Sequence, residues 1–173
     1  VCILADKEEI GSVGVTGMRS EYFEHIMGGL CDAQGVKLED CFANSFCLSA
    51  DVSNAFDPNF PEVSERRNNS QLNYGISICK YTGSRGKGGA SDASAEVMRH
   101  IRKTFDDAGV IWQIATLGKV DQGGGGTVAA YMANRNIVTV DAGVPVLNMH
   151  APAELVSKLD CYETMLACKA IYL

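Results

Sequence analysis

Apolar and polar positions follow two different periods along this chain, and together they predict strands separated by helices. Short continuous apolar runs, typical of buried strands, end at polar or glycine-rich residues, whereas longer segments have an apolar residue at every third or fourth position. The expected strands cover residues 1–5, 44–50, 75–82, 110–115, 137–140 and 144–147. Because the strands alternate with helices, we expect an α/β fold in which no linker divides the chain.

The expected helices begin at residues that favour helix starts. Ser20 can cap a helix that continues to about residue 34, and Ser91 or Asp92 can start another that Gly109 ends. A short helix is expected from Thr127 to residue 133. The apolar stripe of the second long helix comprises Ala93, Val97, Ile101 and Phe105, widened by Met98. The final helix is expected to start near Pro152 and Glu154, with a stripe formed by Leu155, Val156, Leu159, Tyr162 and Leu166.

Two glycine-rich stretches lie between these elements. Residues 82–89 lack the Gly-x-x-x-x-Gly-Lys-Ser/Thr spacing of a nucleotide-binding loop, so nucleotide binding is not expected. The four glycines of residues 123–126 precede Thr127. They suit either a flexible hinge or a close approach of backbone amides to an anion or a polarised carbonyl. A third irregular segment, residues 52–73, is polar and long enough to be functional or mobile.

Composition narrows the classes of protein that fit. A chain of 173 residues with 46% apolar residues can form one domain with a real core. The net charge of −6 gives no reason to expect nucleic acid or an anionic membrane as a partner, and no apolar run is long enough to cross a bilayer. Seven cysteines, without a Cys-x-x-Cys pair, predict buried reduced thiols and a cytoplasmic location. Because Val1 already lies in a strand-like run without an initiator Met, we expect the C-terminal part of a longer protein.

Acidic residues and one histidine follow several of the expected strands. Glu8 and Glu9 come after the first strand, Asp51 after the second and His150 after a late one. In open α/β sheets, ligands bind along the edge where strands end. Carboxylates and an imidazole suit zinc or manganese in a hydrolytic centre, where one carboxylate can bind metal while its neighbour moves protons. The pattern also leaves open the aspartates Asp6, Asp57, Asp121 and Asp141.

Three motifs resemble those of a known family, in the same order. Residues 6–12 read Asp-Lys-Glu-Glu-Ile-Gly-Ser, residues 49–52 read Ser-Ala-Asp-Val before Asp-Pro-Asn at 57–59, and residues 149–154 read Met-His-Ala-Pro-Ala-Glu. They resemble the M18 metallo-aminopeptidases, the family of aspartyl and vacuolar aminopeptidases, and the likeness covers essentially the whole chain. Glutamyl and deblocking aminopeptidases have a similar Glu-Glu, but their Gly-Thr-Asp-Ala element is Gly-Thr-Val-Ala here at residues 126–129.

The resemblance implies a fold and a set of roles. The fold would be the three-layer α/β/α sandwich of zinc-dependent exopeptidases, with residues 1–173 as the C-terminal part of one catalytic domain. Glu8 would be the general base, Glu9 and His150 would bind one metal ion, and Asp51 would bind the second. The resemblance thus implies two divalent metal ions, with zinc as the expected metal. A further histidine, a bridging aspartate and an inserted dimerisation domain would lie upstream of Val1, and the whole protein would be a homo-oligomer, a tetrahedral dodecamer.

The implied substrates are peptides that carry a free N-terminus, with a preference for acidic N-terminal residues. Lys80, Gly126 and Thr127 are the expected substrate-binding residues, and Arg85 and Lys87 are further cations near Lys80. Two enzymatic alternatives stay open: an aminopeptidase of the same family that prefers neutral residues such as leucine, and a metal-dependent deacylase or carboxypeptidase on the same fold. A non-enzymatic binding or assembly module is a third. This chain also has Asn54 where family members have a histidine.

Overall fold

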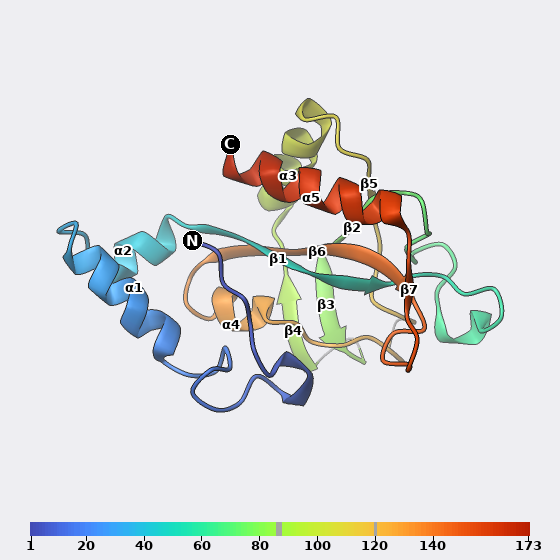
Figure 1. Ribbon diagram of the computed structural model, residues 1–173, viewed down its shortest axis with the longest axis horizontal. Coiled ribbons are helices and arrows are strands. Elements are labelled where there is room, and N and C mark those ends of the chain that lie inside the picture. Colours follow the sequence, from blue (N-terminus) through green and yellow to red (C-terminus); the bar gives the residue numbers. More distant parts are fainter. Residues whose placement is uncertain (86–87, 120) are drawn as a thin grey trace. The chain divides into compact units, whose positions relative to one another are not determined.

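The computed structural model describes residues 1–85, 88–119 and 121–173, which form two compact units (Figure 1). The first unit contains residues 1–47 and 128–139, and the second contains residues 48–127 and 140–173. Within the described ranges, no helix has the length and apolar character needed to cross a membrane.

The first unit is built from short helices around a small core. It contains a 3₁₀ turn, η1 (Glu8–Ile10), and the helices α1 (Tyr22–Asp32), α2 (Leu38–Ala43) and α4 (Ala129–Ala133). Its buried core residues are Met18, Phe42, Met132 and Ile137. The ring of Phe23 stacks on that of Phe42 with centroids 5.4 Å apart, which joins α1 to α2. The backbone N–H of Tyr22 donates to Ser20 Oγ at 3.3 Å, so Ser20 sits at the helix start as its sequence position predicts.

The second unit contains most of a mixed β-sheet. Its strands are β1 (Phe46–Asn54), β6 (Val138–Leu147), β2 (Ile76–Cys79) and β5 (Trp112–Ile114), in that order, with β7 (Leu155–Val156) also paired to β6. Strand β2 is parallel to β5, whereas β6 is antiparallel to both β2 and β7. The central residues Ile76, Ile78 and Val140 are at most 1% exposed. An α/β arrangement is thereby confirmed.

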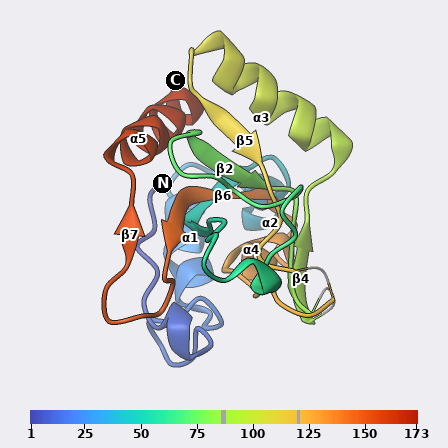
Figure 2. The same cartoon turned by 90° about the vertical axis from the view of Figure 1, so that its right-hand side faces the viewer.

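Helices cover one side of this sheet and a hairpin lies on the other. Helices α3 (Ala95–Asp107) and α5 (Lys158–Tyr172) lie together above the strands, and the hairpin of β3 (Tyr81–Ser84) and β4 (Gly88–Asp92) lies below them (Figures 1 and 2). Ser94 caps α3 by accepting from the backbone N–H of Val97. The expected starts, Ser91 and Asp92, are wrong because both residues pair with β3 as part of β4. The helix buries Met98, Ile101 and Phe105, which belong to the predicted apolar stripe.

A buried carboxylate joins α5 to the loop before β2. Asp160 is fully buried and accepts from the backbone N–H groups of Asn73 and Gly75, at 2.8 Å each. Ser157, which caps α5, donates to Asn73 Oδ1 at 2.7 Å. Gly75 has a φ of +80° and packs so closely on residue 111 that a β-carbon would lie 1.9 Å from the Ile111 carbonyl oxygen. These contacts fix where α5 begins relative to β2.

Several sequence expectations about strands are wrong. Residues 1–5 form no strand and are exposed, because no neighbouring strand takes up their backbone hydrogen bonds in the described structure. Strand β1 continues past Asp51 to Asn54, so Asp51 lies within a strand rather than after it. The expected strands 137–140 and 144–147 are one strand, β6, and Asp141 lies inside it.

Two further expectations need correction near the hairpin and the C-terminus. Residues 81–84 and 88–92 pair as the hairpin β3–β4, whereas the sequence predicted a single strand that ends at residue 82, and Gly86 and Lys87 lie outside the described residues. Leu155 and Val156 belong to β7 because they pair with β6 rather than continue α5. The expected stripe of α5 is wrong as well, since Leu159 is 64% exposed and the helix buries Asp160 and Ala167 instead. Helix α2 was not anticipated, because its six residues are too few to show a period.

Candidate active site

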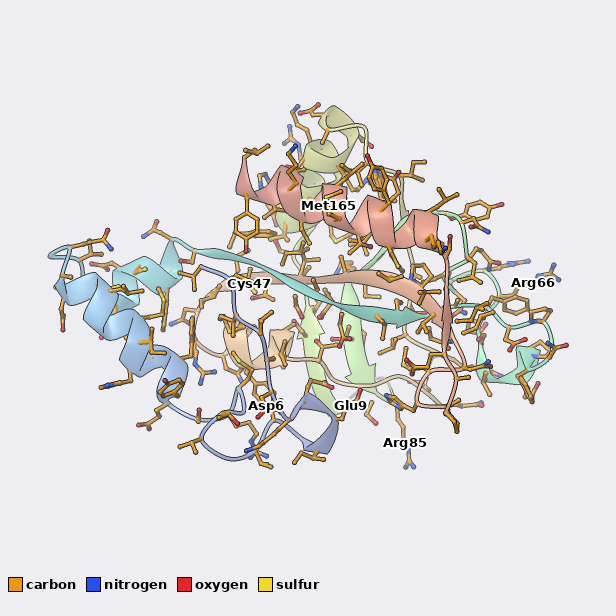
Figure 3. The ribbon with its side chains drawn as sticks, viewed as in Figure 1. Asp6, Glu9, Cys47, Arg66, Arg85 and Met165 are labelled. Atoms are coloured by element: carbon orange, nitrogen blue, oxygen red, sulfur yellow. The ribbon has the colours of Figure 1, made fainter. Side chains whose placement is uncertain are left out.

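The two adjacent glutamates lie on a tight turn of the first unit. Glu8 and Glu9 open the 3₁₀ turn η1, which is flanked by Lys7 at φ +60° and Gly11 at φ +92°. The backbone N–H of Gly11 donates to the Glu8 carbonyl at 2.9 Å, and that of Ser12 donates to the Lys7 carbonyl at 2.7 Å. Glu8 is half-buried and Glu9 is exposed; Figure 3 shows Glu9 on this turn. The backbone geometry therefore presents two neighbouring carboxylates with different degrees of exposure.

Asp6, which the sequence pattern left open as a candidate, has a local partner. Thr16 Oγ1 donates to Asp6 Oδ2 at 2.6 Å, and this hydrogen bond lowers the pKa of the Asp6 carboxyl below its usual value. Asp57 likewise accepts from the backbone N–H of Asn59 at 2.8 Å. Both carboxylates thus stabilise turns of their own segments.

Asp51 projects from the middle of β1 in the second unit. Its Oδ1 accepts from the backbone N–H of Val52 at 2.7 Å, and the residue is exposed. Ser49 and Ser53, two positions before and after it, are 4% and 1% exposed. Since side chains two apart share a face of a strand, Asp51 lies on the same face as these buried hydroxyls. This face borders a small cavity of about 10 Å³ whose wall also includes Thr82, Thr127 and Asp141.

Asp141 is a buried carboxylate that the sequence placed at the end of a strand. It is 6% exposed, and two threonine hydroxyls reach it. Thr127 Oγ1 donates to Oδ1 at 2.7 Å, and Thr82 Oγ1 donates to Oδ2 at 3.2 Å. Burial raises the pKa of Asp141 above its usual value, the hydrogen bond from Thr127 opposes that rise, and the nearby charge of Asp51 adds to it. The signal for this residue in the sequence was its position directly after the expected strand 137–140, which left it open as a candidate.

The two glycine-rich stretches pack against each other. The backbone N–H of Arg85, at the hairpin, donates to the Gly123 carbonyl at 2.8 Å. A β-carbon on Gly124, whose φ is +90°, would lie 2.4 Å from the Gly83 carbonyl oxygen. A β-carbon on Gly126 would lie 3.0 Å from the carbonyl oxygen of Gly89. Of the two interpretations of residues 123–126, a close backbone approach therefore describes them better than a free hinge, and the backbone that they approach is the hairpin.

His150 occupies a turn after β6. Its φ of +67° is in the left-handed region, and its backbone N–H donates to Glu154 Oε1 at 2.5 Å. The backbone N–H of Ala151 donates to the Asn148 carbonyl at 2.9 Å, which closes the turn. The residue is exposed. The turn thus places an imidazole at the surface of the second unit.

The cations proposed near the substrate differ in their surroundings. Lys80 forms an ion pair with Asp92, and both side chains are about half exposed. Arg85 projects from the hairpin into solvent, as Figure 3 shows, and has a φ of +52°. Lys87 lies outside the described residues. A substrate carboxylate that approached Lys80 would have to compete with Asp92.

Glu9, Asp51 and His150 supply oxygen and nitrogen donors, the chemistry that zinc accepts. Among the residues that the structure describes, however, no three His, Cys, Asp or Glu side chains are gathered so that they could hold a metal ion. The donor types therefore fit zinc, and the described part of this chain does not complete a zinc site by itself.

One glycine keeps Asp51 in its place, which gives a first prediction. A β-carbon on Gly143 of β6 would lie 1.7 Å from the Asp51 carbonyl oxygen. Gly143→Ala must therefore push β1 away from β6, and we expect the free energy of unfolding in urea to fall by about 3 kcal/mol, at the upper end of overpacking costs. Gly28→Ala is the matched control, because a β-carbon there meets nothing within 4 Å and should stabilise α1 by about 0.5–1 kcal/mol. Equal urea midpoints for Gly143→Ala and wild type would contradict this prediction.

Comparison with known sequences shows which protein family this chain matches. A family model described as aminopeptidase I zinc metalloprotease (M18) matches residues 1–172. A probable M18 family aminopeptidase 1 of Clostridium acetobutylicum is 51% identical over 168 residues, which cover 95% of this chain and 36% of that protein. Its counterpart in Borreliella burgdorferi is 45% identical over 178 residues, covering 99% of this chain and 39% of that protein. The chain thus spans well under half the length of these curated relatives.

Solved structures of known proteins also match nearly all of this chain. The crystal structure of an M18 aminopeptidase from Thermotoga maritima has a TM-score of 0.92 at 42% identity, covering 96% of this chain and 38% of that one. The aminopeptidase I structure from Clostridium acetobutylicum has a TM-score of 0.89 at 50% identity, covering 96% of this chain and 36% of that one. A yeast aminopeptidase solved as the mApe1 dodecamer has a TM-score of 0.80 at 25% identity, covering 98% of this chain and 36% of that one. The fold class implied by the resemblance is confirmed.

Proposed function

Because the chain belongs to the M18 family of aminopeptidase I zinc metalloproteases, we propose that it is the C-terminal part of the catalytic domain of a zinc-dependent aminopeptidase. The observation that carries the proposal is the family match over residues 1–172, which includes all three motifs. The share of the relatives' length that the chain covers, 36–39%, supports its being one part of a larger catalytic protein. The reaction is removal of the N-terminal residue of a peptide by attack of water.

We assign the proton transfers to Glu8. Its carboxylate takes a proton from the attacking water and passes it to the leaving amine, which is the work of a general base that becomes an acid. The half-buried position of Glu8, beside the exposed Glu9, supports a division of labour between the two side chains. Glu9 and His150 would hold one zinc ion and Asp51 a second. Zinc, when bound, lowers the pKa of water and polarises the scissile carbonyl.

We assign substrate contacts to Lys80, Gly126 and Thr127. Thr127 lines the cavity that Asp51 borders, and Gly126 precedes it in the chain. Both residues belong to the same unit as Asp51. Lys80 would attract an acidic side chain at the substrate's N-terminal position. Its ion pair with Asp92 is the specific observation that favours the second candidate, an aminopeptidase that prefers neutral residues such as leucine.

A substrate panel separates these specificities in the full-length protein. We expect Asp- and Glu-p-nitroanilide to be cleaved with higher kcat/KM than Leu-p-nitroanilide, and N-acetylated substrates to be resistant. Lys80→Ala should reduce the preference for Asp over Leu about tenfold, the effect of losing one interaction of about 1.4 kcal/mol. Lys103→Ala is the matched control, because Lys103 also forms an exposed ion pair, with Asp107 on α3. A preference for Leu that Lys80→Ala leaves unchanged would establish the neutral alternative. Release of acetate from the N-acetylated substrates, without release of p-nitroaniline, would favour a deacylase.

We further propose that the full-length protein is a homo-oligomer of the tetrahedral, dodecameric type and works in the cytoplasm. The match to a yeast relative solved as a dodecamer supports the assembly. In the described structure all seven cysteines remain outside disulfides, which supports a reducing compartment. The expected partners are peptide substrates, and the net charge of −6 supports neither nucleic acid nor an anionic membrane as a partner.

A further inference from the structure

The buried carboxylate of Asp141 joins two segments that are far apart in sequence. Thr127, at the end of the glycine stretch, donates to one carboxylate oxygen, and Thr82 of β3 donates to the other. Asp141 itself lies on β6, opposite Cys79 in the register with β2. Both oxygens are therefore engaged by hydroxyls, and the carboxylate connects the sheet to the hairpin and to the glycine stretch.

A buried carboxylate at this position of β6 costs free energy that an apolar side chain would not. Burying a charged group without a counter-ion costs far more than burying an apolar side chain. Within the part of the chain that the structure describes, no cation pairs with Asp141, and Lys80 is paired with Asp92. Its neighbour Val140 on β6 is 1% exposed, so the strand accommodates apolar side chains readily. An apolar residue at position 141 could not accept the hydrogen bonds from Thr127 and Thr82.

These hydrogen bonds hold the glycine stretch, residues 123–126, whose backbone is flexible by itself. Four consecutive glycines have more accessible backbone conformations than any other sequence of that length. Gly124 packs on the Gly83 carbonyl, and the Gly123 carbonyl accepts from the backbone N–H of Arg85. Thr82 belongs to the same hairpin as Gly83. Asp141 thus holds the glycine stretch through Thr127 and holds the hairpin under it through Thr82.

We propose that Asp141 is a positioning residue: by binding Thr127 and Thr82, it fixes one conformation of residues 123–127 and thereby aligns the substrate backbone. This inference rests on the proposed function, which assigns substrate contacts to Gly126 and Thr127. Asp141 does not touch the substrate. The ligand that it serves is the N-terminal residue of a peptide, held through the stretch that Asp141 orders.

The test combines amide hydrogen exchange with kinetics in the full-length protein. Asp141→Leu should accelerate exchange of the Gly123 and Arg85 amides, which donate to the Lys119 and Gly123 carbonyls, and raise KM, each about tenfold or more, the factor that corresponds to 1.4 kcal/mol. The effect on kcat should be smaller. Asp141→Asn should restore most of the protection and of KM, because its amide oxygen can accept from Thr127 while its NH₂ group donates to Thr82 Oγ1.

Thr127→Val and Thr127→Ser provide a second route if Asp141→Leu does not fold. Val should loosen the same amides, and Ser, which keeps the hydroxyl, should restore their protection. The double variant Asp141→Leu/Thr127→Val should exchange no faster than Asp141→Leu alone, because the hydrogen bond that Thr127→Val removes is one of the two that Asp141→Leu already removes. The matched control is Thr139→Val: this buried β6 hydroxyl donates to the Ile137 carbonyl, and its loss should leave exchange of the Gly123 and Arg85 amides unchanged.

Unchanged exchange in both Asp141→Leu and Thr127→Val would overturn the inference, and so would faster exchange with an unaltered KM. Failure of the proposed function shows itself differently. If the wild-type protein cleaves no peptide, the aminopeptidase assignment fails, while the exchange data still decide whether Asp141 orders the glycine stretch.

Discussion

Glu8→Gln in the full-length protein is expected to lower kcat by about 10²–10⁴, the usual cost of losing a general base. Glutamine has nearly the shape of glutamate but cannot take a proton from water at neutral pH. The turn that carries residue 8 is held by backbone hydrogen bonds, from Gly11 to the Glu8 carbonyl and from Ser12 to the Lys7 carbonyl, so the variant should fold normally. Zinc content measured by elemental analysis should equal that of wild type.

The control for this variant is Glu62→Gln, which makes the same chemical change at an exposed position of a 3₁₀ turn at residues 61–63. Glu62→Gln should retain wild-type kcat. Near wild-type kcat in Glu8→Gln would remove Glu8 from its catalytic role. A loss of activity accompanied by a loss of zinc would instead make Glu8 a ligand, and the two glutamates would exchange roles.

The second large effect is expected at His150, where replacement by alanine should remove metal. Loss of an outer partner of a metal ligand already weakens binding about 10–100-fold, so loss of the ligand itself should exceed that range. Zinc per protomer after dialysis is the measurement, and kcat should fall in parallel. Added zinc at high concentration should restore part of both.

The backbone of His150 requires a second variant. Its φ of +67° lies in the left-handed region, which histidine adopts more readily than alanine, so alanine can also disturb the turn besides removing the imidazole. His150→Gly relieves that strain and should lose zinc to the same extent. His100→Ala, at an exposed position of α3, should keep its zinc. Full zinc occupancy in both His150 variants would show that this imidazole is no ligand.

The sequence predicted local structure well wherever local interactions decide it. Ser20 lies next to the start of α1, Gly109 follows the end of α3 with a φ of +69°, and α3 buries Met98, Ile101 and Phe105 of the predicted stripe, although its cap is Ser94 rather than the expected Ser91 or Asp92. These outcomes depend on capping, on glycine conformation and on period, which neighbouring residues determine. The roles of Glu8, Glu9, Asp51 and His150 came from motif resemblance and stay predictions.

Pairing between distant segments is where sequence reasoning failed. An apolar run at residues 1–5 predicted a strand, but a strand exists only when a neighbour accepts its hydrogen bonds. Residues 155–156 suited a helix by period, yet they pair with β6. Because Asp141 is polar, the sequence predicted that a strand ends there. It lies within β6 instead, because the hydroxyls of Thr82 and Thr127 donate hydrogen bonds to its carboxylate.

The family, the α/β class and the apolar face of α3 were therefore readable from residue order alone, whereas two expected helix starts, at residues 91–92 and 152–154, were wrong because those residues precede or belong to strands. Only the tertiary structure decided which strands pair, that the two glycine-rich stretches support each other, and that a buried carboxylate connects them. The physical reason is that caps and periods act over a few residues, whereas a hydrogen bond such as that between Thr82 and Asp141 joins residues 59 positions apart. Such contacts form only once the chain has folded around them.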